Sequence, residues 1–314
     1  MSAAVLLGAL ALDAVFGEPD WLWRRAPHPV VVMGRAIDAL DRRWNDERRR
    51  ITARRALGTL AVFALVAASV AIGGIASFAV QALGALGTVL EMVAVAILVA
   101  QRSLAEHVGA VRDGLANGIG AGRRAVSMIV GRDPERLDRA GVSRAAVESL
   151  AENFADGVVA PALWYFVAGL PGILAYKVVN TADSMIGHRT ARHGAFGWAA
   201  ARLDDAMNWP AARLSALLIA FVRPRALGRT WRVVRHDAPR HRSPNAGWPE
   251  SAMAGALDLA LGGPRSYGDG VLNEPVLNAD GRRDADPADI DRALCVFRDA
   301  CLLQAALVGA VALA

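Results

Sequence analysis

The chain has 314 residues, of which 54% are hydrophobic, and it carries a formal net charge of +5. Some apolar segments reach about 20 residues, the length that crosses a bilayer core, so the composition excludes an ordinary soluble globule. The pI near 10.0 does not call for a nucleic-acid partner, because cytoplasmic loops of membrane proteins accumulate basic residues. A second interpretation of this charge is that some arginines attract anionic substrates.

The first predicted element is an apolar helix over residues 5–16. It lacks the basic region and the small-residue cleavage site of a signal peptide, and it contains Asp13, so we expect it to be retained. Glycines and prolines between Gly17 and Pro29 predict a turn-rich loop after it.

Two membrane spans are the clearest elements. Residues 56–80 are 25 residues without a charge, and residues 82–100 contain only Glu91. The junction at Gln81 has no arginine, whereas residues 18–55, 101–155 and 223–300 contain 10, 8 and 12 arginines. The positive-inside rule therefore predicts a hairpin with an outward tip and cytoplasmic ends, and three polar segments that face the cytoplasm.

The central segment predicts two helical arms, over residues 145–169 and 173–186, with a break around Pro171. Each arm is short for a span, which indicates a re-entrant or partly buried helical hairpin that opens to the cytoplasm. Residues 211–222 and 302–314 are also ambiguous between tilted spans and buried helices. The predicted fold class is an all-α, multi-pass integral membrane protein.

Lys177 is the only lysine, against 34 arginines. Lysine is a compact charge that fits a narrow site and can lose its proton when buried, whereas arginine is a broad fork. Lys177 shares a helical face with Asn180 and Ser184, beside Asp183, and this combination suits phosphate and Mg²⁺ binding. The alternatives are a lysine that reaches the membrane interface, and an ion pair that holds helices together.

Three carboxylates recur at helical spacing just before the central apolar run. Glu148, Glu152 and Asp156 are four residues apart, so on an α-helix they form one stripe. Like charges at this spacing repel, so the stripe invites Mg²⁺ or an arginine from another helix. The alternative is a solvated acidic face.

A further polar group precedes residues 211–222. Arg202, Asp204, Asp205 and Asn208 lie within two helical turns, with Asp204 and Asn208 on one face. Paired oxygen ligands are typical of Mg²⁺ sites, in which waters and substrate phosphates complete the shell. N-capping of the following helix is the alternative, and both roles are compatible.

Residues 223–300 predict a polar cytoplasmic lobe within a single integral membrane domain that comprises residues 1–314. Within this lobe, residues 241–251 place basic, amide and hydroxyl groups before a helix. Free N–H groups at a helix N-terminus attract anions, so this loop is a candidate phosphate site. The sequence has no Walker A, GxGxxG, nucleophile-elbow or HExxH motif, so the familiar nucleotide-binding and hydrolase signatures are absent.

Taken in order, these segments resemble the CobD/CbiB family, the adenosylcobinamide-phosphate synthases of vitamin B12 biosynthesis. The resemblance covers nearly the whole chain, and Glu18 stands where the family more often has aspartate. The matching pieces are Leu12-Asp13 with Gly17-Glu18-Pro19 and His28-Pro29-Val30; Glu148-Ser149-Leu150-Ala151-Glu152-Asn153 with Asp156-Gly157-Val158-Val159-Ala160-Pro161; Tyr176-Lys177 with Asn180-Thr181 and Asp183-Ser184-Met185; Arg202-Leu203-Asp204-Asp205 with Asn208-Trp209; and Ser243-Pro244-Asn245-Ala246-Gly247-Trp248-Pro249-Glu250.

The resemblance implies an enzyme that joins aminopropanol, or its O-phosphate, to a propionate of adenosylcobyric acid. A carboxylate and an amine do not condense unaided at neutral pH, so ATP and Mg²⁺ are expected as cofactors. Lys177 would neutralise the transferring phosphoryl group, and the amine would lose its proton to a carboxylate or to His28. The expected catalytic residues are Lys177, Asp183, Glu152 and His28; the expected Mg²⁺ ligands are Asp156, Asp183, Asp204 and Asp205; and the expected substrate or phosphate contacts are Asn153, Asn180, Ser184, Arg202, Asn208, His241, Ser243, Asn245 and Glu250.

Two rival functions remain open. A corrinoid transporter or permease component would need a polar path on both sides of the bilayer, and a membrane scaffold for other B12 enzymes would not need the acidic stripe. The expected partners are the corrinoid and aminopropanol (phosphate) substrates and the lipid bilayer. An assembly with other membrane enzymes of cobalamin biosynthesis stays open as a further partner.

Overall fold

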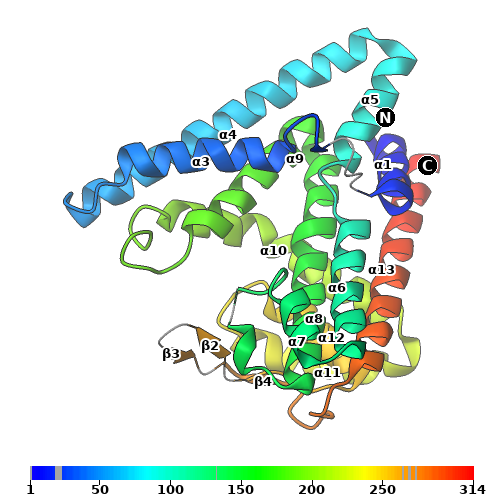
Figure 1. The fold of residues 1–314 in the computed structure, drawn as a ribbon. Helices are drawn as coiled ribbons and strands as arrows, with labels where there is room; N and C mark the ends of the chain where they lie inside the picture. Colours follow the sequence, from blue (N-terminus) through cyan, green and yellow to red (C-terminus); the bar gives the residue numbers. More distant parts are fainter. Residues whose placement is uncertain (1, 18–22, 132, 264, 268–269, 273) are drawn as a thin grey trace. The chain divides into compact units, whose positions relative to one another are not determined.

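The computed structural model describes the chain except residues 1, 18–22, 132, 264, 268–269 and 273 (Figure 1). Within the described residues, four helical stretches are long and apolar enough to cross a membrane: 51–82, 84–116, 139–186 and 287–313. Strands occur only as short pieces there, so the predicted all-α membrane fold class is confirmed. Glu18, which the family resemblance includes, lies outside the described residues.

The chain divides into two compact units. Unit 1 comprises residues 1–100, 160–208 and 311–314, and unit 2 comprises residues 101–159 and 209–310. The helices of unit 1 are α1 (Ser2–Phe16), α3 (Pro29–Trp44), α4 (Ile51–Ala82), α5 (Gly84–Ala96), α9 (Ala160–Ile186) and the first part of α10 (Trp198–Phe221). Unit 2 contains α6 (Gln101–Ala116), α7 (Ile119–Val126), α8 (Arg139–Phe154), the π-helical turn η2 (Ala155–Val159), the rest of α10, α11 (Leu227–Asp237), α12 (Gly247–Leu257), nearly all of α13 (Pro287–Leu313), and the short 3₁₀ turns η1 (Pro134–Arg136), η3 (Pro224–Ala226) and η4 (Ala238–Arg240).

The strands form two small antiparallel pairs in unit 2. β1 (Leu261–Gly262) pairs with β4 (Val276–Leu277), and β2 (Arg265–Tyr267) pairs with β3 (Gly270–Leu272). They lie in the predicted lobe, residues 223–300, which falls within unit 2. That the lobe is cytoplasmic, and that the chain is a single domain, stay predictions.

In unit 1, α4 and α5 form the predicted hairpin. The helices meet at Leu83, and they pack so closely that a Cβ atom on Gly87 would overlap the carbonyl oxygen of Val80. Glycine at this position therefore allows the backbones to approach, as small residues commonly do between membrane helices. The direction in which the tip faces stays a prediction.

α9 contains the predicted break. Ala168 and Gly169 leave helical geometry, and Gly169 has φ +62°, a left-handed conformation that glycine adopts without strain. Pro171 follows within the first turn of the second arm, where its missing N–H costs little. A Cβ atom on Gly172 would overlap the carbonyl oxygen of Trp164, so the arms lie against each other at the bend.

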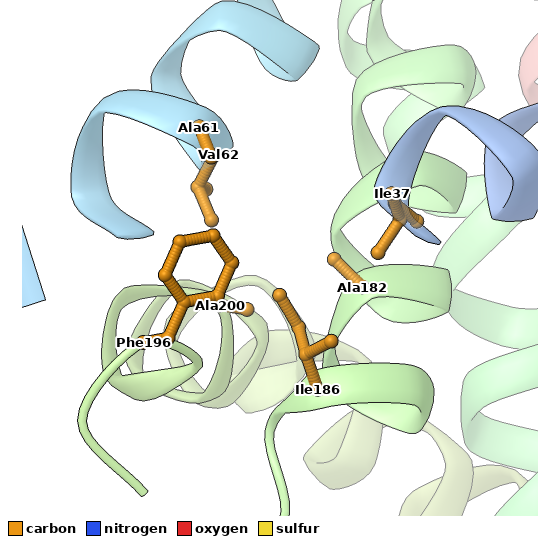
Figure 2. Close-up of a cluster of buried hydrophobic side chains, with 7 residues drawn as sticks. All are labelled: Ile37, Ala61, Val62, Ala182, Ile186, Phe196 and Ala200. Atoms are coloured by element: carbon orange, nitrogen blue, oxygen red, sulfur yellow. The ribbon is translucent and has the colours of Figure 1, made fainter. Parts of the chain in front are cut away.

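One core of unit 1 lies where α3, α4, α9 and α10 converge. Figure 2 shows Phe196 inserted between side chains of these helices, and it is fully buried. The cluster consists of Ile37, Ala61, Val62, Ala182, Ile186, Phe196 and Ala200. Burying one large aromatic side chain contributes about 1.5–3 kcal/mol, so this cluster anchors the chain that connects α9 to α10.

Unit 2 packs α8 at its centre. Nearly every residue of α8 is buried, and Phe154 at its end meets Phe297 of α13 edge to face, with ring centroids 5.5 Å apart. α11 packs closely on α12, because a Cβ atom on Gly255 would lie 2.6 Å from the Cα atom of Thr230. α8 therefore carries Glu148 within a packed helical core.

Candidate functional site

A chain of buried polar groups connects α9 to α10 in unit 1. The Tyr176 hydroxyl donates to Asn208 Oδ1 at 2.9 Å, and Asn208 Nδ2 donates to Asp204 Oδ2 at 2.9 Å. Asn180 Nδ2 donates to the other carboxylate oxygen, Asp204 Oδ1, at 3.2 Å. The structure thus brings three predicted site residues, Asn180, Asp204 and Asn208, into one network.

Most residues of this network are buried. Tyr176, Asn208 and Asp204 are 0%, 1% and 8% exposed. Buried polar groups are costly unless they are hydrogen-bonded, and a satisfied network fixes one arrangement of its helices. Trp164 Nε1 adds a bond to the Met207 carbonyl at 3.1 Å, so both arms of α9 contact α10.

Lys177 and Asp183 lie on the same arm of α9 and are both half-buried. The Lys177 carbonyl accepts the Thr181 hydroxyl at 2.6 Å. The Asp183 carboxylate lies directly over Gly187, where a Cβ atom would overlap Oδ1. Ser184 is exposed, and its hydroxyl bonds the Asn180 carbonyl of its own helix at 3.0 Å.

Asp205 lies beside two arginines at the start of α10. Arg202 Nη1 is 3.5 Å from Asp205 Oδ2 at i, i+3; Arg202 is exposed and Asp205 is half-buried. Burial raises the pKa of Asp205, and the nearby charges of Arg202 and Arg189 act in the opposite direction without cancelling the rise. Asp205 therefore differs from Asp204, whose two oxygens are occupied by amides.

The predicted acidic stripe of unit 2 does not share one environment. Glu148 is buried and accepts the Gly262 N–H at 2.7 Å, Glu152 is exposed, and Asp156 is half-buried within η2. The π-helical turn also ends the regular α-helical spacing on which the stripe was predicted, and such turns occur frequently at functional sites. Asn153 bonds its own helix through the Ser149 carbonyl at 2.9 Å.

Residues 241–251 form a tight entry to α12 in unit 2. The Ser243 hydroxyl accepts the N–H groups of Asn245 and Ala246 at 3.2 and 3.1 Å. Asn245 Oδ1 accepts from Arg213 Nη1 at 3.0 Å. These bonds use the polar groups that the sequence predicts as phosphate contacts to order the loop itself, and the phosphate role stays a prediction.

His241, the first residue of this loop, lies in a buried cluster with two carboxylates. Its side chain is 5% exposed, and Nε2 lies 3.9 Å from Glu250 Oε2 and 3.6 Å from Glu274 Oε2. Burial lowers the pKa of His241, but the nearby carboxylates of Glu274 and Glu250 raise it by more, so the net shift of the pKa is upward. His241 and Glu250, both predicted, therefore come together.

His28 starts a helix. Its Nδ1 accepts the Val30 N–H at 3.2 Å, which caps α3, and its ring meets Trp23 edge to face with centroids 4.4 Å apart. The capping bond gives His28 a structural role that its predicted role as a base did not include. The base role stays a prediction.

Sequence reasoning missed several residues that the structure makes prominent. Glu274 has no motif around it, and only its position before Pro275 marks it. Asp41, Asn45 and Arg54 form a buried polar cluster, but they lie in an arginine-rich segment whose charge the positive-inside rule already explains.

The four carboxylates predicted to hold Mg²⁺ are not gathered into one cage. Within the described residues, no group of three or more His, Cys, Asp or Glu side chains has the spacing of a metal site. Mg²⁺ commonly uses one or two carboxylates with waters and substrate phosphates, so the residues fit an ion that arrives with a nucleotide. Both carboxylate oxygens of Asp204 accept bonds from amides, so Asp204 is part of the α9–α10 network.

Comparison with known proteins gives one consistent result. A family model described as CobD/Cbib protein matches residues 6–297. The chain is 53% identical to a "Cobalamin biosynthesis protein CobD" of Sinorhizobium sp over 98% of both chains. It is 52% identical to that of Rhizobium meliloti (100% of this chain, 98% of the relative) and 47% identical to that of Rhodobacter capsulatus (99% and 97%).

No solved structure is significantly similar to this chain. The family match rests instead on sequence, and it spans the segments that build the α9–α10 network, the π-helical turn and the loop before α12. The chain therefore belongs to the CobD/CbiB family.

Proposed function

We propose that this protein is the adenosylcobinamide-phosphate synthase of a cobalamin pathway. It would form an amide bond between a propionate carboxylate of adenosylcobyric acid and the amine of aminopropanol or its O-phosphate, at the expense of ATP. The observation that carries the proposal is the match to the CobD/CbiB family over residues 6–297, which includes every predicted site residue.

The reaction needs an activated acid. In the proposed sequence, a propionate oxygen attacks the terminal phosphorus of ATP and ADP leaves. The amine nitrogen then attacks the acyl carbon, phosphate leaves, and the amine's proton passes to a protein base. Atoms and charge balance in both steps, and ATP is the only co-reactant besides the amine.

The α9–α10 site of unit 1 suits the first step. Mg²⁺, bound with ATP, would neutralise phosphate charge. Half-buried Lys177 would stabilise the transferring phosphoryl group, since a fixed cation in a partly dry site acts more strongly than in water. Asp183, which is half-buried, and Asp205 would contribute carboxylate oxygens to the coordination shell of the ion.

A direct test uses purified protein in detergent or nanodiscs with adenosylcobyric acid, Mg-ATP and either aminopropanol or its O-phosphate. Mass spectrometry of the corrinoid and nucleotide products should show one amide formed per ADP released. AMP and pyrophosphate would instead indicate an adenylate. No amide with either amine, from protein that remains folded, would contradict the proposal.

The same preparation separates the rivals. Corrinoid uptake into proteoliposomes without product would favour the transporter. Activity only after addition of other cobalamin-biosynthesis enzymes would favour the scaffold. Amide formation by the isolated protein excludes both as its sole function.

A further inference from the structure

The loop of residues 187–197, which connects α9 to α10 in unit 1, is held by side chains of α3 and α4. Arg192 donates from Nε and Nη2 to Asp41 Oδ2, at 3.2 and 2.6 Å. The Arg192 carbonyl oxygen accepts from Asn45 Nδ2 at 3.0 Å and from Arg54 Nη2. Arg192 is thus hydrogen-bonded through both its backbone carbonyl and its side chain.

The three residues that bond Arg192 also bond each other. Asn45 Nδ2 donates to Asp41 Oδ1 at 2.7 Å, and Arg54 Nε donates to Asn45 Oδ1 at 2.9 Å. Asp41, Asn45 and Arg54 are 6%, 4% and 6% exposed. Asp41 is buried whereas the Arg192 side chain is 43% exposed, so losing Arg192 would leave a buried carboxylate without that charged partner, and the cluster favours one geometry.

The ends of the loop are fixed as well. A Cβ atom on Gly197 would overlap the carbonyl oxygen of Ile186, so the last residue of α9 touches the residue before α10. Phe196 is buried in the core of Figure 2, and its carbonyl oxygen lies where a Cβ atom on Gly58 would stand. The loop is therefore short, closed and anchored along its length.

The helices on either side carry the candidate site. Asp183 lies one turn before the loop, and Asp204 and Asp205 lie about two turns after it, with Asn180 bonded across to Asp204 at 3.2 Å. A small shift of the loop would change the spacing of these groups. We propose that Asp41, Asn45 and Arg54 are positioning residues that set the register of α9 against α10 through Arg192.

This inference rests on the proposed amide synthesis, and it differs from a merely structural role in one respect. A loss of stability reduces the amount of folded enzyme. A loss of register lowers turnover by folded enzyme, because misplacing reacting groups by about 1 Å can cost about 100-fold in rate.

The experiment compares Asp41→Asn, Asp41→Glu and Arg192→Lys with wild type, with rates normalised to folded protein by size exclusion and thermal melting. For Asp41→Asn and Arg192→Lys we expect kcat to fall by about 10- to 100-fold, with KM for ATP within about twofold. Asp41→Glu should recover part of kcat. Asp38→Asn is the matched control, since Asp38 pairs with Arg42 on the exposed face of the same helix.

A double-mutant cycle gives the second readout. Asn180→Ala removes one of the bonds between α9 and α10, so its effect on kcat should be non-additive with that of Asp41→Asn if both act on the same register. Arg192→Lys keeps the test decisive if Asp41→Asn does not fold. The proposal is overturned by kcat within about twofold of wild type in both variants, or by effects that simply add. Wild type without product instead contradicts the proposed function itself, and the positioning role then falls with it.

Discussion

Lys177 lies on α9 one residue after Tyr176, at the edge of the buried polar network. It is half-buried, and the next turn of the helix carries Asn180 and Thr181. A lysine places its charge at the end of a thin stem. An arginine would need room for a planar fork and would direct its donors differently.

Lys177→Arg is therefore expected to lower kcat/KM for amide formation by about 10- to 1000-fold although the charge is kept. Steady-state rates with Mg-ATP and adenosylcobyric acid measure the effect. Arg42→Lys is the control, because Arg42 is an exposed partner of Asp38 and should tolerate the exchange. Full activity of Lys177→Arg would show that only positive charge matters at this position.

His241 makes stability depend on pH. Its pKa is raised above 6.5 in the folded protein, mainly because Glu274 and Glu250 outweigh the effect of burial. The folded state therefore holds the proton more tightly than the unfolded state. The resulting stabilisation is present below the unfolded pKa and is lost as pH rises through the folded pKa.

We expect the melting temperature of wild type to fall relative to that of His241→Gln as pH rises from about 6 to about 9. Melting in detergent at constant ionic strength measures this difference. His107→Gln is the control, since His107 is exposed and bonds only the Ser103 carbonyl of its own helix in the described structure. A constant difference across the range would show that His241 does not change its charge on folding.

At the scale of elements, α4 contains two adjacent glycines, one packed against another helix and one with open space beside it. A Cβ atom on Gly73 would lie 2.6 Å from the Cα atom of Pro171, at the bend of α9, whereas a Cβ atom on Gly74 would meet nothing within 4 Å. The clash at Gly73 is with backbone atoms of Pro171, so rotating a side chain cannot relieve it. The contact between α4 and the bend thus depends on one missing methyl group.

Gly73→Ala should destabilise the protein by about 1–3 kcal/mol, as overpacking does, while Gly74→Ala should be neutral or stabilising by up to about 1 kcal/mol, because alanine favours helix. Thermal or urea unfolding in detergent compares the pair. Equal effects of the two substitutions would mean that α4 does not touch the bend in solution.

Local signals account for the elements that the sequence predicts well. The uncharged run at residues 56–80 lies within α4, and Pro171 marks the break of α9 to within three residues. Contacts between distant segments had no such signal. Asp41 meets Arg192 across 151 positions, and neither residue differs in sequence from the many charged residues of cytoplasmic loops.

The candidate site shows the same difference between features set by local sequence and contacts between distant segments. Asn180, Asp204 and Asn208 were predicted from helical spacing, and the spacing was sufficient because regular helices carry them. The stripe at Glu148 failed as one surface because Glu148 is buried against Gly262, and a backbone N–H from a distant strand leaves no trace in a sequence. Register and burial, both tertiary properties, decide which polar residues face each other.

At the scale of the whole molecule, arginine distribution predicts how the chain lies in the membrane. The turn between α4 and α5 at Leu83 lacks arginine, while residues 18–55 and residues 223–300 contain 10 and 12 arginines. Translocating a loop with many positive charges is unfavourable, so these segments should stay cytoplasmic. Placing ATP-dependent chemistry on that side is consistent with where ATP is found.

Single cysteines introduced into a Cys295→Ser, Cys301→Ala background test this orientation. Leu83→Cys should react with a membrane-impermeant maleimide in intact spheroplasts, because Leu83 is exposed and lies at the hairpin tip that is predicted to face outward. Arg48→Cys and Asp280→Cys, both at exposed positions in arginine-rich segments, should react only after lysis. The reverse pattern would place the arginine-rich segments outside, away from ATP, and would contradict both the orientation and the proposed cytoplasmic synthesis. Labelling of all three in lysed cells controls for accessibility, so that a negative result in spheroplasts reports sidedness and not burial.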